Sequence, residues 1–187
     1  MKRALVLALV STVSLPALCR TETIVTTCDG TMCSWQRPVV AAPKGWVRDE
    51  AAGQELQIEA LVPAGAEFQT APAVMYARAA YKPWNPGTLA HFIAGEHDQF
   101  RRRFPGATVR RTTPLTDADG KTLAVYEYAA PKGRHHLELV AFADEGDYFL
   151  VFGLRAKSAQ MLRRARAAFR ALVGAYRKGQ AHSPPNM

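Results

Sequence analysis

The stretch Lys121–Leu154 constrains the fold most, because it contains three consecutive segments with the composition of β-strands. We expect strands over Thr122–Ala129, His136–Ala143 and Tyr148–Leu154. The acidic loop between the last two segments is short and contains Gly146, which adopts a positive φ angle readily. Such a loop predicts a hairpin, so the last two strands are expected to be antiparallel neighbours.

The segment Tyr148–Leu154 is apolar at both odd and even positions. A strand with one solvent-facing side would alternate apolar and polar residues, so we expect both sides of this strand to be covered. Two amphipathic helices are predicted as the covers. The first has Thr88 as its N-cap and ends near Arg103. The second has Ser158 as its N-cap and ends near Tyr176.

Further extended segments precede the first helix. Ala73–Tyr81 and Leu56–Val62 predict strands, and the alternation in Leu56–Val62 as far as Ala60 predicts one buried and one wet face. Thr23–Thr27 and Trp35–Val40 are shorter extended segments. The predicted fold class is α+β, with a mainly antiparallel β-sheet flanked by helices.

The N-terminus has the pattern of a secretory signal peptide. Met1-Lys2-Arg3 supplies positive charge, and Ala4–Leu18 is apolar except for one threonine and two serines. A membrane-spanning helix is the alternative, but it needs roughly 20 apolar residues and Pro16 interrupts this shorter segment. We therefore expect export to the periplasm or secretion, with cleavage after Cys19.

Cleavage at that point divides the chain into residues 1–19 as signal peptide, residues 20–178 as a single domain and residues 179–187 as a disordered tail. The domain keeps Cys28 and Cys33, with four residues of a turn-forming loop between them. An oxidising compartment favours a disulfide between them. A metal or redox site is the alternative, although the spacing is not Cys-x-x-Cys and no second cysteine pair completes a zinc site.

The formal charge of +8 comes largely from arginine. Exported basic proteins meet anionic lipid head groups or acidic wall polymers before nucleic acid, and aromatic residues are not interleaved with these arginines as in nucleic-acid binders. We therefore consider an anion-binding surface on a membrane, a wall or an acidic envelope protein, with simple solvation of helices as the alternative. The arginines concerned form two groups, Arg163, Arg166, Arg170 and Arg177 in the last helix, and Arg101, Arg102 and Arg103 at the end of the first.

Three further residues are candidates for a pocket or a metal site. His136 and Glu138 are two apart on a predicted strand, so they share a face and offer two metal ligands or a base with its orienting carboxylate. Glu96 lies within the apolar stripe of the first helix, where a carboxylate needs a partner. Either it meets Arg103 or a strand residue at the rim, or it lines a polar pocket between helix and sheet.

Several segments resemble the PsbP-like α/β sandwich superfamily, which includes DcrB-like bacterial envelope proteins and a photosystem extrinsic subunit. They are Pro43-Lys44-Gly45-Trp46, Leu61-Val62-Pro63 and Met75-Tyr76-Ala77-Arg78, together with the order of elements from Pro43 to Arg177. The resemblance implies an antiparallel sheet between helices and a binding or assembly role without chemistry. It carries no functional residue across.

The sequence contains no triad-like neighbourhood of a serine or cysteine, no glycine-rich phosphate loop and no acid pair placed for glycoside chemistry. We therefore predict no enzyme activity and no cofactor. The expected function is that of a non-catalytic exported binding or assembly protein of the cell envelope. The alternatives are a periplasmic protein that binds a small ligand or metal, and a hydrolase of unknown type.

Overall fold

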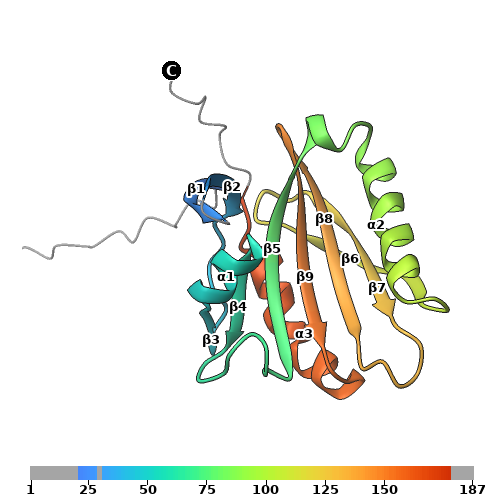
Figure 1. Cartoon of the computed structure of the whole chain (residues 1–187). Coiled ribbons are helices and arrows are strands. Elements are labelled where there is room, and N and C mark those ends of the chain that lie inside the picture. Colours follow the sequence, from blue (N-terminus) through green and yellow to red (C-terminus); the bar gives the residue numbers. More distant parts are fainter. Residues whose placement is uncertain (1–20, 29–30, 178–187) are drawn as a thin grey trace, which may run out of the picture.

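The computed structural model describes residues 21–28 and 31–177, so the predicted signal peptide and C-terminal tail lie outside the described residues. The described chain forms nine strands, three α-helices and one 3-10 turn (Figure 1). The strands are β1 (Thr21–Cys28), β2 (Thr31–Pro38), β3 (Trp46–Arg48), β4 (Glu59–Pro63), β5 (Ala73–Tyr81), β6 (Thr108–Thr116), β7 (Thr122–Ala129), β8 (Leu137–Glu145) and β9 (Tyr148–Ala156). The helical elements are α1 (Glu50–Leu56), η1 (Lys82–Trp84), α2 (Leu89–Arg103) and α3 (Ala159–Gly174).

Seven strands form one antiparallel sheet in the order β3-β4-β5-β9-β8-β7-β6, and β1 and β2 form a separate hairpin. The predicted α+β class is confirmed. Strands β8 and β9 are antiparallel neighbours joined at Gly146, whose φ angle is +48°, as the acidic loop predicts. None of the helices in the described residues has the length and apolar character needed to cross a membrane.

Strand β9 lies in the middle of the sheet, between β5 and β8, and both of its faces are buried. Phe149 and Val151 pack in the cluster under α2, with the ring centroid of Phe149 4.8 Å from that of Phe92. Leu150 and Phe152 point to the opposite face and pack in the cluster under α3. The predicted covering of both sides of this strand is therefore confirmed.

The two long helices begin at the predicted residues. The Thr88 hydroxyl accepts a hydrogen bond from the backbone N–H of His91 at the start of α2, and Ser158 does the same for Met161 at the start of α3. Such caps satisfy backbone donors that have no partner within the helix. Figure 1 shows α2 on one face of the sheet and α3 on the other.

The structure differs from the predicted strand over Leu56–Val62. Helix α1 ends at Leu56, Gln57 takes a left-handed conformation with φ of 55°, and β4 begins only at Glu59. Glu59 and Ala60 are 1% and 0% exposed, so the predicted wet face is wrong. The reason is tertiary, because arginines of β2 and β3 contact the Glu59 carboxylate on the face that it shares with α3.

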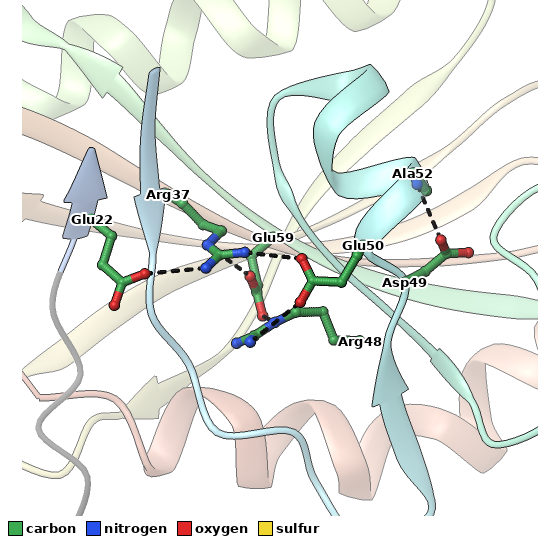
Figure 2. Close-up of polar contacts among 7 residues, drawn as sticks. All are labelled: Glu22, Arg37, Arg48, Asp49, Glu50, Ala52 and Glu59. Atoms are coloured by element: carbon green, nitrogen blue, oxygen red, sulfur yellow. Dashed lines mark hydrogen bonds and ion pairs between the residues drawn. The ribbon is translucent and has the colours of Figure 1, made fainter. Parts of the chain in front are cut away.

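A charged cluster holds the β1–β2 hairpin and α1 to this end of the sheet (Figure 2). Buried Glu59 accepts a hydrogen bond from Arg48 Nε at 2.5 Å and lies 3.6 Å from Arg37 Nε. Arg37 also bonds Glu22 in β1 at 3.1 Å and Glu50 in α1 at 3.2 Å. Burial raises the pKa of the Glu59 carboxyl above its usual value, and the two guanidinium groups only partly offset this.

Candidate functional site

Six polar residues form a band across the sheet face that α2 covers in part. Every member is half-buried, and the band runs between α2 and the segment that precedes β5. The strands bring its members together, because Arg155 of β9 is paired with Val74 of β5 and with Glu138 of β8. We call this set the polar band; its residues are Tyr76, Arg78, Glu96, His136, Glu138 and Arg155.

At one end of the band, Glu96 of α2 pairs with Arg78 of β5. The Glu96 Oε2 and Arg78 Nη2 atoms are 2.5 Å apart. Burial alone would lower the pKa of the Arg78 guanidinium, but Glu96, with smaller contributions from Tyr76 and Glu138, outweighs burial and the pKa is raised. Glu96 thus meets a strand residue rather than Arg103, which was one of the two arrangements that the sequence left open. Glu96 also lines a hollow of about 260 Å³ beside α2.

Near the other end of the band, Tyr76 and His136 converge on Glu138. The Tyr76 hydroxyl hydrogen-bonds the carboxylate, and His136 Nε2 lies 3.4 Å from Glu138 Oε2. Burial raises the pKa of Tyr76 well above its usual value, so the phenol stays protonated and can donate. Strand β8 begins at Leu137 rather than at the predicted His136, so His136 lies one residue before the strand, but its ring still contacts Glu138.

Gly153 of β9 gives Tyr76 its place in the band. Gly153 is the strand partner of Tyr76, and a Cβ atom there would lie 2.1 Å from the Tyr76 ring. The ring therefore lies directly over the glycine, which lets the hydroxyl reach Glu138 across the sheet. An alanine at this position would displace Tyr76 from that contact.

The band does not bring Glu96, His136 and Glu138 together as one metal site. Glu96 is paired with Arg78, whereas His136 and Glu138 contact each other. The described part of the chain contains no group of three or more histidine, cysteine, aspartate or glutamate residues placed to hold a metal ion. If the protein binds a metal ion instead, the predicted residues therefore supply two neighbouring candidate ligands, Glu138 and His136.

The predicted arginine surface divides into two, because α2 and α3 lie on opposite faces of the sheet. Arg101, Arg102 and Arg103 occupy the last turn of α2, where the helix dipole favours positive charge. Arg101 also pairs with Asp98 at 3.3 Å. These three arginines therefore have a local explanation within their own helix.

The arginines of α3, together with Arg177 beyond the end of that helix at Gly174, fall into a paired and an unpaired group. Arg166 pairs with Glu127 at 3.3 Å and Arg177 pairs with Asp119 at 3.2 Å. Arg163 and Arg170 are exposed on the outer side of α3 and have no ion pair among the described residues. Arg164, which the sequence analysis did not include, is exposed beside them.

The disulfide prediction concerns side chains outside the described part of the structure. The backbone register pairs Cys33 with Thr26 and Cys28 with Thr31, so the two cysteines are not directly opposite each other in the hairpin. The disulfide, like the signal peptide and its cleavage after Cys19, stays a prediction.

The sequence alone indicated no site role for Tyr76, Arg78 or Arg155. A signal for Arg78 was present, because it interrupts an otherwise apolar strand and a buried cation needs a partner. Its pairing with Glu96 depends on the tertiary structure, which brings a side chain of α2 to a side chain of β5. Nothing in the local sequence indicates that Tyr76 reaches Glu138 over Gly153.

Comparisons with known proteins add little to this geometry. No protein-family model matches the sequence, and no curated protein matches it with statistical significance. One similar solved structure is the "Crystal Structure of Protein of Unknown Function PA94 from Pseudomonas aeruginosa, Putative Regulator". The two share 12% sequence identity with a TM-score of 0.46, over 80% of this chain and 92% of the other. At this level the likeness supports no statement about function, and the PsbP-like resemblance stays a prediction.

Proposed function

We propose that this chain is a non-catalytic, exported binding protein of the cell envelope that docks on an anionic membrane surface through the outer side of α3. The observation that carries the proposal is the charge of that helix. The 16 residues of α3 include four arginines and no acidic residue. We call its exposed part the arginine face, formed by Arg163, Arg164 and Arg170.

Helix stability does not account for the arginine face. Lys and Arg favour the last turn of a helix, but the last turn of α3 contains no basic residue. Acidic residues three or four positions away would also stabilise the helix, and α3 has none. Arg166 and Arg170 are four apart and repel each other. Because these like charges destabilise the helix, contact with an external surface of negative charge would stabilise it.

The chemistry of the face favours a membrane over an acidic protein partner. Protein interfaces have an apolar, aromatic core, whereas the residues exposed between these arginines are small, such as Ala167 and Ala171. The apolar side of α3 is buried against the sheet, so it is not available for insertion into lipid. An exposed surface with cationic and no acidic side chains suits lipid head groups, each nearby arginine contributing about 1 kcal/mol.

The test compares two triple variants with the same change in charge. Arg163→Gln, Arg164→Gln and Arg170→Gln together are expected to weaken binding to phosphatidylglycerol vesicles by about 3 kcal/mol, or roughly 100-fold. Arg101→Gln, Arg102→Gln and Arg103→Gln together form the control on the opposite face and should change binding at most a few-fold. Vesicle co-sedimentation at low and high salt measures both, and salt should weaken wild-type binding.

Equal losses in the two variants would contradict the proposal, because they would show attraction by net charge alone. Unchanged binding in the α3 variant would also contradict it. If wild-type protein ignores anionic vesicles but binds an acidic envelope protein through the same arginines, the membrane is the wrong partner.

A further inference from the structure

A second hollow opens on the face opposite the arginine face, at the end of the polar band. It has a volume of about 150 Å³ and lies between residues 68–72 and the turn before β8. Four residues of cationic or protonatable type are among those that line it, and no acidic residue is. They are Arg155, Lys157, His135 and His136, and Phe68 and Val74 supply an apolar wall.

Arg155 is the central cation of this hollow. Its guanidinium carbon lies 5.3 Å from the centre of the Phe68 ring. Among the described residues, no carboxylate forms an ion pair with it. Glu138 faces Arg155 in the strand register, but its carboxylate takes Tyr76 and His136 as partners instead. A half-buried guanidinium fixed on an aromatic ring and lacking a carboxylate presents its donors to a ligand.

The backbone turn before β8 adds both histidines to the same hollow. His135 has a φ of 45°, a left-handed conformation that is uncommon for residues other than glycine. In an extended segment, consecutive side chains would point to opposite faces. The left-handed residue allows His135 and His136 to line one hollow together. Strained backbone of this kind often occurs at functional sites.

Lys157 completes the polar rim. Its Nζ donates a hydrogen bond to the Thr70 carbonyl oxygen at 2.7 Å, which holds the ammonium group at the hollow and leaves further N–H donors. The cationic and protonatable residues of the rim therefore come from three places, which are β9, the residue that follows β9, and the turn before β8.

We propose that this hollow binds the carboxylate of a small organic acid, with the carboxylate on Arg155 and the apolar body against Phe68 and Val74. An arginine fork matches a carboxylate with two parallel hydrogen bonds. The volume is well below the roughly 300–1,000 Å³ of pockets for drug-sized ligands, so it suits a carboxylate with one small ring or a short alkyl group. A phosphate dianion would not use the apolar wall.

Benzoate is the probe, titrated into the full exported protein and followed by calorimetry or by NMR shifts. We expect a dissociation constant in the millimolar range or tighter, about −4 kcal/mol. Arg155→Gln should weaken binding at least about tenfold, because the charged pair is lost. Arg134→Gln is the matched control, since Arg134 is exposed on the same turn and does not line the hollow.

Two comparison ligands identify what is recognised. Benzamide keeps the ring but has no charge, and inorganic phosphate keeps charge but has no apolar body; both should bind at least about tenfold more weakly than benzoate. If Arg155→Gln does not fold, Lys157→Gln serves as the second variant and should weaken benzoate a few-fold. Equal binding of benzamide and benzoate, phosphate binding as tight as benzoate, or full benzoate affinity in the Arg155 or Lys157 variant would overturn the proposal. The triple variant of α3 should bind benzoate as tightly as the wild type does. Benzoate binding can therefore fail or succeed independently of membrane docking.

Discussion

Phe152→Ala is expected to lower the free energy of unfolding by about 3–5 kcal/mol, because the side chain is fully buried beneath α3 and the surrounding helix and strands cannot collapse into the cavity. Its ring centroid lies 5.0 Å from that of Tyr176. Phe149→Ala on the opposite face of the same strand should have an effect of similar size, because Phe149 packs beneath α2. Urea unfolding followed by circular dichroism measures both.

The control for this pair is Trp84→Ala. The Trp84 side chain is larger than that of phenylalanine but 83% exposed, so its replacement should change the free energy of unfolding by no more than about 0.5 kcal/mol. A loss below about 1 kcal/mol for either phenylalanine would show that its face of β9 is not covered. The two-sided burial of this strand would then be wrong.

Arg37→Met should produce the second large loss, about 3 kcal/mol near pH 7. Arg37 is the one residue in Figure 2 that contacts all three glutamates of the cluster, Glu22, Glu50 and Glu59. Without it, the buried Glu59 carboxylate keeps only Arg48, and a buried charge that loses a partner is strongly destabilising. Methionine keeps much of the volume of the arginine side chain, so the loss of stability measures the effect of removing the charge. Thermal and urea unfolding measure it.

The effect should depend on pH in a defined direction. The pKa of Glu59 is higher in the folded protein than in the unfolded chain, so the folded state binds this proton more tightly. The contribution of Glu59 to stability is therefore full below the unfolded pKa and is lost as the pH rises through the raised folded pKa. The loss caused by Arg37→Met should thus be smaller near pH 5 than near pH 7.

Two variants check this interpretation. Glu59→Gln cannot titrate, so it should remove most of the pH dependence from the Arg37→Met background. Arg110→Met removes an arginine that is 73% exposed and pairs with Glu127, and it should lower stability by less than about 1 kcal/mol. If Arg37→Met lowers the free energy of unfolding no more than Arg110→Met does, the Arg37 guanidinium does not stabilise the buried Glu59 carboxylate.

The sheet and its two long helices were predictable because their signals are local. Thr88 and Ser158 are good N-caps. The apolar residues at both odd and even positions of Tyr148–Leu154 predict that both faces of the strand are covered. Helix α1 was missed because it is only seven residues long and contains Gly53. Close packing rather than helix propensity explains the glycine, because a Cβ atom there would lie 3.0 Å from the Ile58 carbonyl oxygen.

The candidate site was predictable only where two residues lie close together in the sequence. His136 and Glu138 are neighbours in sequence, so their contact follows from spacing. Glu96 was identified as a carboxylate that needs a partner, but its partner Arg78 lies on a strand 18 positions earlier. The arginines of α2 and α3 were grouped by charge, and only the tertiary structure places them on opposite faces of the sheet.

The orientation of the protein on a vesicle tests the proposed function most directly. A fluorophore attached at Ala167→Cys lies on the outer side of α3, and one at Ala94→Cys lies on the exposed side of α2. Docking through the arginine face predicts that phosphatidylglycerol vesicles protect the label at position 167 from an aqueous quencher and leave the label at position 94 accessible. Equal protection of both labels, or protection of position 94 alone, would contradict docking through α3.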